Sequence, residues 1–158
     1  MVHRIAVPDE VLSLGLLDRV DYSDAFEART TQHRSPRQWG DLILERSSPT
    51  VLAFVRAAHS RVGRMPLAPQ DADHPLGWSI LEETPAHLVM GIDGGIVTPR
   101  VVIWTSPGRV VFATVLRYET AAARLIWAGG RHVHRAVARY LVAVATRPHE
   151  GHAVRTGV

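Results

Sequence analysis

The chain of 158 residues carries a formal net charge of +3, and 46% of its residues are hydrophobic and 21% charged, which is typical of a globular domain. It contains no cysteine, which excludes disulfide bonds, thiolate metal sites and cysteine nucleophiles. No apolar run approaches the roughly 18–20 residues that span a bilayer, and the N-terminus lacks the order of a signal peptide. We therefore expect one cytoplasmic domain over residues 1–158 without a membrane span, its core at about 5–146 and a flexible tail at 147–158.

The basic residues are unusual because all 18 of them are arginine. Guanidinium groups favour phosphate and nucleic-acid recognition, whereas the codon usage of a GC-rich genome gives the same bias without such a function. No aromatic residues are interleaved with the arginines for base stacking. We therefore expect no nucleic-acid partner and interpret the arginines as solvated surface residues.

The N-terminal part of the chain alternates between extended and helical patterns. Residues 2–7 form a short extended segment followed by a helical turn at Pro8, and residues 20–30 alternate apolar and polar side chains as a half-exposed strand does. Two helices follow, over residues 35–48 and 48–63. Each begins with Ser-Pro, which supplies an N-cap and then fixes the first helical φ.

Residues 64–77 carry three prolines and no periodicity, which predicts a loop. The hydrophobic period then changes to two, and short turns require neighbouring strands to be antiparallel. We therefore expect an antiparallel sheet of five or six strands, followed by a long helix from Thr120 to about Thr146. One strand candidate contains Pro99 and either splits there or shortens the sheet. The four candidates of this region are residues 77–84, 87–95, 96–108 and 109–119.

The last helix contains the stretch IWAGGRHVHRAVARYL, residues 126–141. On a helical wheel its arginines lie opposite an apolar stripe, and Gly129 and Gly130 flank that stripe. Glycine costs about 0.8–1 kcal/mol against alanine inside a helix, so the pair needs a reason. It allows close helix–sheet packing, a kink, or free space for a ligand beside the helix.

Two histidines of this helix do not form a metal site. His132 and His134 lie roughly 160° apart around the axis, whereas two ligands of one ion on a helix need a spacing of three or four. HEGH at residues 149–152 is one residue too short for the zinc motif HExxH. We expect His132 at the surface and His134 at the edge of the apolar stripe, and we expect no metal.

Three motifs in order resemble a known family. DYSDAF at 21–26, GWSILEETPAHLVMG at 77–91, and TVLRYET with HVHRAVARYL from residue 114 to 141 are similar to a bacterial family of unassigned function. That family resembles the SRPBCC, or helix-grip, superfamily of START-type lipid-transfer domains, polyketide aromatase/cyclases and birch-pollen-allergen-like proteins. The resemblance covers roughly residues 5–146.

This resemblance implies an α+β helix-grip fold. In that fold two short helices follow the first strand, and a curved antiparallel sheet wraps a long C-terminal helix. A mostly apolar cavity lies between sheet and helix. The order of the elements expected above agrees with it.

Some polar and aromatic side chains are candidates for such a cavity. For each the alternative is a structural role: ordinary core for the tryptophans, a surface strand residue for the arginine, a satisfied core-edge contact for the histidine and tyrosine. The candidate ligand-binding residues are Trp78, Trp104, Arg117, Gly130, His134 and Tyr140.

Three functions remain open at this point. The first is a module that binds an apolar small molecule, a lipid or a polyketide-like compound, without a cofactor. The second is an aromatase/cyclase- or dehydratase-like enzyme, in which a cavity His/Arg pair acts as acid/base and enolate stabiliser. The third is a structural domain with a filled core. The sequence does not show whether the chain is an enzyme or whether it forms a homodimer.

Overall fold

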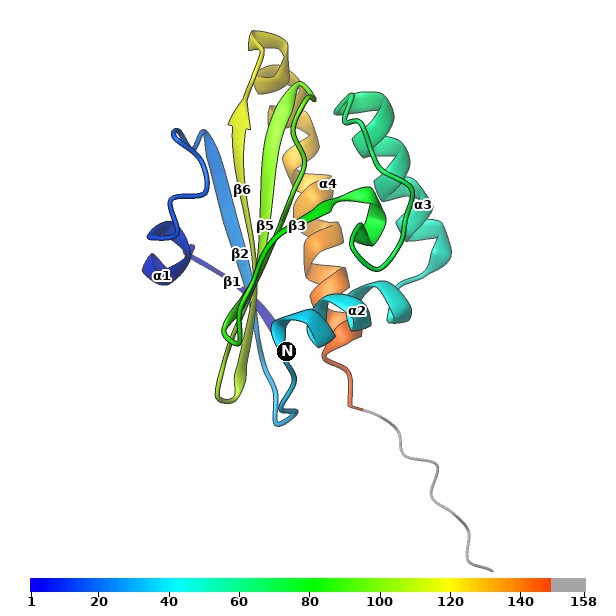
Figure 1. Ribbon diagram of the computed structural model, residues 1–158. Helices are drawn as coiled ribbons and strands as arrows, with labels where there is room; N and C mark the ends of the chain where they lie inside the picture. The colour runs from blue at the N-terminus through cyan, green and yellow to red at the C-terminus, as the bar shows by residue number, and fades with distance from the viewer. Residues whose placement is uncertain (149–158) are drawn as a thin grey trace, which may run out of the picture.

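The alternating segments of the sequence form one six-stranded antiparallel sheet (Figure 1) in a computed structural model that describes residues 1–148. The strand order is β1-β2-β6-β5-β4-β3, so β2 joins the N-terminal strand to the meander of the last four. Of the tail predicted at residues 147–158, residues 149–158, including HEGH, lie outside the described residues. The strands are β1 Val2–Ile5, β2 Tyr22–Arg29, β3 Ser79–Glu83, β4 His87–Gly91, β5 Val97–Ser106 and β6 Arg109–Tyr118.

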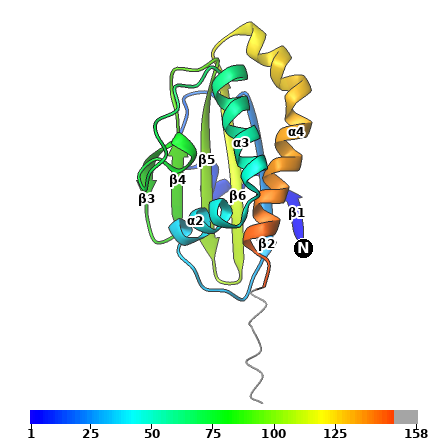
Figure 2. The same ribbon diagram turned by 90° about the vertical axis from the view of Figure 1, so that its right-hand side faces the viewer.

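The helices lie mainly on one face of this sheet. Figure 2 shows α2, α3 and the long α4 in front of the strands, whereas α1 lies on the other side of the sheet in Figure 1. We call the face under α2 and α4 the inner face and the face under α1 the outer face. The helices are α1 Asp9–Leu12, α2 Pro36–Arg46, α3 Pro49–Ala57 and α4 Ala121–Ala145, with a π-helical segment η1 Ala58–Val62 and a 3₁₀ turn η2 Pro75–Gly77.

Alternate residues of each strand face the two sides of the sheet, because successive side chains of a strand point in opposite directions. Ile103 and Phe112 belong to the large apolar cluster of the inner face. Val102 and Ala113 belong to a smaller cluster that Val11 of α1 covers on the outer face. Both faces of the central strands are therefore buried.

Local signals place the helix ends. Ser35 caps α2 with a reciprocal pair of hydrogen bonds: Gln38 N donates to Ser35 Oγ at 3.2 Å, and Ser35 N donates to Gln38 Oε1 at 3.0 Å. After α3 the helix widens into η1, where Gly63 N donates to Ala58 O five residues earlier at 3.0 Å. Gly63 then ends the helical segment, as predicted.

The α+β class, the order of the elements and the antiparallel meander predicted from the sequence are confirmed. Pro99 does not split its strand, because β5 runs unbroken from Val97 to Ser106.

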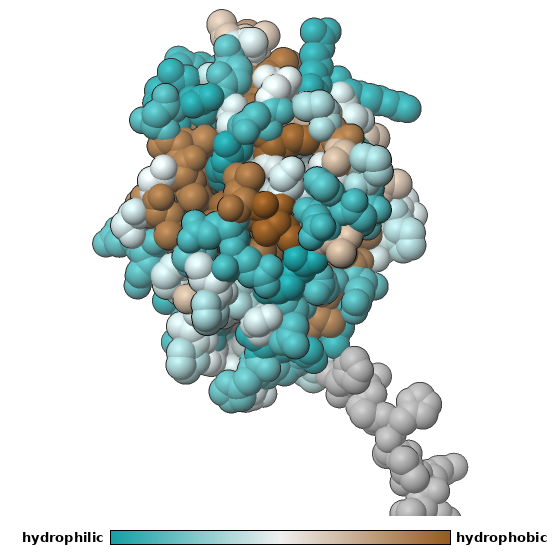
Figure 3. All heavy atoms as spheres, in the orientation of Figure 1, coloured by the Kyte–Doolittle hydropathy of each residue, from teal (hydrophilic) through white to brown (hydrophobic). Residues whose placement is uncertain are grey.

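None of the helices within residues 1–148 is long and apolar enough to cross a lipid bilayer. In Figure 3 apolar side chains reach the surface in the upper part of the view, and hydrophilic ones cover most of the lower part.

The two Ser-Pro helix starts give a test of the capping signal. Ser35→Ala removes the Oγ that accepts the hydrogen bond from Gln38 N, while the bond from the backbone N–H of residue 35 to Gln38 Oε1 can remain. The loss should lower the free energy of unfolding by about 1 kcal/mol. Ser48 occupies the same position before α3, but its side chain makes no capping bond. Ser48→Ala should therefore change stability by less than about 0.5 kcal/mol. Urea denaturation measures both, and equal losses would contradict the assignment.

Candidate functional site: a cavity between sheet and C-terminal helix

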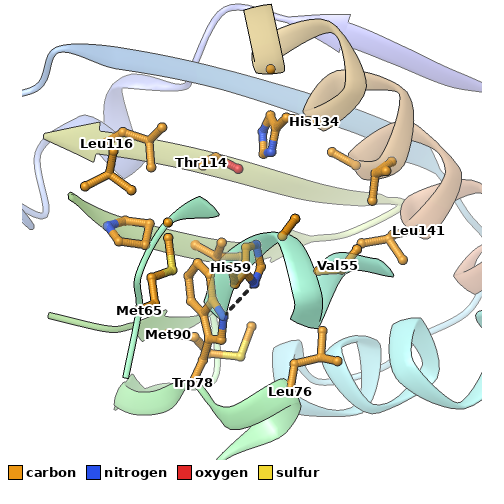
Figure 4. Close-up of a pocket in the computed structure, with 18 of the residues that line it drawn as sticks. Val55, His59, Met65, Leu76, Trp78, Met90, Thr114, Leu116, His134 and Leu141 are labelled. Atoms are coloured by element: carbon orange, nitrogen blue, oxygen red, sulfur yellow. Dashed lines mark hydrogen bonds between the residues drawn. The ribbon is translucent and has the colours of Figure 1, made fainter. Parts of the chain in front are cut away.

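The helices do not fill the space over the inner face of the sheet. A cavity of about 360 Å³ lies there, walled by α2, α3, η1, η2, strands β4 to β6 and α4 (Figure 4). Nearly all of its lining side chains are apolar. The polar exceptions are His59, Thr114 and His134, together with the indoles of Trp78 and Trp127.

Three of the six predicted site residues line this cavity: Trp78, Gly130 and His134. The other three do not, and their placement corrects the prediction from the sequence. The alternation within a strand shows which residues share a face, but not which face carries the cavity. Alternation therefore could not show that two of these three residues, Trp104 and Arg117, lie on the outer face.

Trp104 belongs to the outer face of β5. Its ring stacks on the ring of His87, with centroids 5.5 Å apart and planes 10° from parallel, and it packs against the outer apolar cluster. Arg117 lies on the outer side of β6, where it pairs with Asp18 at 2.5 Å and with Glu119 at 2.7 Å. Both residues have structural partners, and the predicted cavity His/Arg pair does not include Arg117.

Tyr140 also lies outside the cavity. Its hydroxyl oxygen accepts a hydrogen bond of 3.0 Å from the backbone N–H of Ser48. The bond connects the C-terminal half of α4 to the joint between α2 and α3. The structural alternative for Tyr140, a satisfied core-edge contact, therefore describes its position.

The two glycines of α4 differ in their surroundings. Gly130 lines the cavity, whereas Gly129 is exposed. A Cβ atom built on either would meet nothing within 4 Å, so neither glycine serves a close approach of helix to sheet. Gly130 leaves free space beside the helix, which is one of the reasons considered for the pair. Nothing in the structure explains Gly129.

His134 is part of a polar network centred on Asp24 of β2. Asp24 is 2% exposed, and its carboxylate accepts hydrogen bonds from Tyr22 OH at 2.5 Å and from His134 Nε2 at 3.3 Å. Arg135 Nε donates to Tyr22 OH at 3.0 Å and lies 3.7 Å from Asp24 Oδ2. Because a carboxylate only accepts, the hydrogen between His134 and Asp24 belongs to His134 Nε2.

The network keeps Asp24 ionised. Burial opposes the charge, but the bonds from His134 and Tyr22 and the charge of Arg135 outweigh it and hold the pKa of Asp24 below its usual value. Burial, followed by the hydrogen bond to Asp24, raises the pKa of Tyr22 to about 12. The hydroxyl of Tyr22 therefore keeps its proton and remains a donor. The imidazole of His134 therefore contacts a buried carboxylate, that of Asp24, which also has Tyr22 and Arg135 as partners.

A second histidine faces the cavity from η1. Trp78 Nε1 donates a hydrogen bond of 3.2 Å to His59 Nδ1, drawn in Figure 4, and the two rings lie 5.1 Å apart. Burial, followed by the charges of His134 and Arg56, lowers the pKa of His59 to about 4. His59 is therefore neutral at physiological pH.

Two buried polar atoms of the cavity wall have no hydrogen-bond partner among residues 1–148: Thr114 Oγ1 and Trp127 Nε1. Thr114 lies opposite Asp24 in the pairing of β2 with β6 and projects from β6 into the cavity (Figure 4). Trp127 lies on α4, with its ring 5.1 Å from the rings of both Tyr22 and His134. Buried polar groups are seldom left unpaired, so these two mark places where a ligand atom or water would fit.

Sequence reasoning missed Asp24, Tyr22, His59 and Arg135. The motif DYSDAF held a signal for the first two, because a period of two places Tyr22, Asp24 and Phe26 on one face, with a carboxylate between two aromatic side chains. No local pattern marks His59, because its hydrogen-bond partner Trp78 lies 19 residues later in the chain. Arg135 was assigned to the solvated stripe, and nothing in the helix itself indicated its contact with Tyr22.

The described part of the chain contains no group of three or more histidine, aspartate or glutamate side chains arranged to hold a metal ion. His132 is exposed, and it lies away from the cavity lining. The polar chemistry of the cavity thus rests on two imidazoles, one of them backed by a carboxylate.

The low pKa of His59 predicts a defined pH dependence of stability. Unfolded histidine titrates near 6.5, so between pH 6.5 and about 4 the unfolded chain binds more protons than the folded one. Acidification through this window should lower the free energy of unfolding by about 3 kcal/mol through His59. His59→Gln, which keeps an acceptor for Trp78 but does not titrate, should lack this part of the loss in urea denaturation at pH 7, 5.5 and 4. Identical pH profiles would contradict the burial of a neutral imidazole.

The chain was also compared with known proteins. Neither the models of protein families nor the sequences of curated proteins gave a match. The functional argument therefore rests on the cavity and its polar groups.

Proposed function

We propose that this chain is a helix-grip domain of the SRPBCC type that holds an apolar small molecule between its sheet and its C-terminal helix. The single observation that carries the proposal is the cavity of about 360 Å³ with an almost wholly apolar wall. Its volume falls in the range of about 300–1,000 Å³ found for small-molecule sites. The order of β2, two helices, the meander and α4 supports the helix-grip assignment.

The cavity has an access route between α3–η1 and α4. Phe54 and Val62 on one side are each 52% exposed, and Ile126 and Val133 on the other are 45% and 51% exposed, although all four line the cavity. Apolar side chains that both line a cavity and meet solvent mark its mouth. An apolar ligand would cover them, which explains why the stripe of α4 is only partly buried in its N-terminal half.

A matched pair of glycine variants tests binding. Gly130→Leu places a side chain in the cavity and should raise the Kd of the neutral fluorescent probe N-phenyl-1-naphthylamine by at least about tenfold. Gly129→Leu adds the same side chain on the exposed side and should leave the Kd unchanged. Both variants should melt no lower than the wild type, because neither new Cβ meets a neighbour and leucine favours the helix.

Native mass spectrometry of the wild type from its source cells provides a second readout. A retained apolar molecule, absent from Gly130→Leu, would agree with the proposal. A wild-type protein that neither retains a molecule nor binds the probe would favour a structural role with an unused cavity.

A second candidate, an enzyme that moves a proton, is favoured by the contact between Asp24 and His134. When neutral His134 donates Nε2–H to Asp24, its Nδ1 holds a lone pair and has no hydrogen-bond partner among residues 1–148. Such an imidazole can accept a proton from a carbon next to a carbonyl group. The C–H electron pair becomes the C=C bond of an enolate, the π pair of the carbonyl moves onto its oxygen, and the proton goes to Nδ1. Asp24 stabilises the imidazolium that forms.

Hydrogen exchange into an enolisable ketone tests this second candidate. In D₂O the wild type should accelerate exchange of the α-protons of 2-tetralone, followed by ¹H NMR. His134→Ala should reduce the protein-dependent rate by about 100-fold or more. His132→Ala, at the exposed histidine two residues away, should retain it. Exchange at the uncatalysed rate while 2-tetralone is bound would leave binding as the function.

A further inference from the structure

The hydrogen bond between Trp78 and His59 determines which nitrogen of His59 carries its proton. An indole N–H is a donor only, so His59 Nδ1 must hold a lone pair in order to accept it. A neutral imidazole with an unprotonated Nδ1 carries its hydrogen on Nε2. The wall at η1 therefore contains an N–H donor of defined position.

This donor is held in place by its neighbours. Trp78 is 7% exposed and directly precedes β3, which fixes the indole against the sheet. The backbone of His59 accepts a hydrogen bond of 3.1 Å from Met65 N. The two nitrogens of an imidazole point in widely different directions, so Nε2–H is directed away from Trp78. It has no acceptor among residues 1–148, although His59 lines the cavity.

The lining of the cavity favours a neutral partner for this donor. Among residues 1–148 no arginine lines the cavity, and His59 and His134 are the only titratable residues in the lining. His134 lies against the carboxylate of Asp24, at 3.3 Å. Arg56, whose charge acts on His59, does not line the cavity, so a buried carboxylate on the ligand would have no guanidinium partner in the wall, which is costly. A neutral oxygen, by contrast, needs one N–H donor only.

We infer that the ligand is an uncharged apolar molecule with a carbonyl oxygen, and that His59 Nε2–H donates a hydrogen bond to this oxygen. The inference rests on the proposed binding function and narrows it to ketones and related neutral carbonyl compounds. His59 is then the residue that distinguishes such a ligand from a hydrocarbon of the same shape. Trp78 acts through His59 as a positioning residue.

Two probes of equal shape separate this hydrogen bond from apolar binding. 2-Acetylnaphthalene carries a carbonyl oxygen where 2-isopropenylnaphthalene carries a CH₂ group. The quantity to compare is the ratio of the two Kd values, hydrocarbon over ketone, because it cancels changes in cavity shape. His59→Phe should lower this ratio by about tenfold, the effect expected of an N–H left without its acceptor. His132→Phe, the same change at an exposed histidine, should leave the ratio as in the wild type.

Trp78→Phe provides the second variant. It keeps His59 but removes the indole N–H, so that the hydrogen of His59 is free to move to Nδ1. The ratio should fall by less than in His59→Phe. ¹⁵N NMR of the wild type should show His59 protonated on Nε2 only, and the Nε2 signal should shift when the ketone binds but not when the hydrocarbon does.

The outcomes are distinguishable. If the wild type binds neither probe, the proposed binding function fails. If it binds both and His59→Phe leaves the ratio unchanged, binding stands and the carbonyl inference is overturned. A His59 protonated on Nδ1 in the wild type overturns it as well, and this measurement does not depend on the folding of any variant.

Discussion

The buried carboxylate of Asp24 is the constraint on which the arrangement of helix and sheet depends. An isolated charge in this position would be very costly, so folding must bring its partners to it. Tyr22 comes from the same strand, but His134 and Arg135 come from the middle of α4, more than a hundred residues later. Their contacts fix how far α4 lies along β2 and how it is rotated about its axis. With α4 in this position, the cavity lies between the helix and the inner face of the sheet.

The two halves of α4 then have different environments. Its C-terminal half packs tightly over the sheet through small and branched residues such as Ala138, Leu141 and Val142, which are nearly fully buried. Its N-terminal half follows the same apolar period but has no matching surface beneath it, so Ile126 and Val133 remain about half exposed. Apolar surface left open in this way is stabilised by whatever covers it.

Much of the fold could be predicted because its signals are local: Ser-Pro at two helix starts, a change of period to two, and short turns. The site could be predicted only in part. Periodicity placed His134 and Gly130 beside the apolar stripe of α4, which the structure shows to face the cavity. It could not tell which side of the sheet would receive α4, and so it could not show that Trp104 lies on the outer face. Asp24 and His59 acquire their chemistry from partners distant in the sequence, which no local pattern reveals.

The π-helical segment η1 has a consequence for how this protein tolerates insertions and deletions. Its wider turn accommodates one residue more than a regular helix would, so Gly63 and the residues after it keep their position against the sheet. A chain one residue shorter between Ala58 and Val62 would continue α3 as an ordinary helix. Gly63 and the residues after it, which lead to Trp78, would then shift against the sheet, and the contact between His59 and Trp78 would change. A change of length at η1 would therefore alter the polar part of the cavity wall.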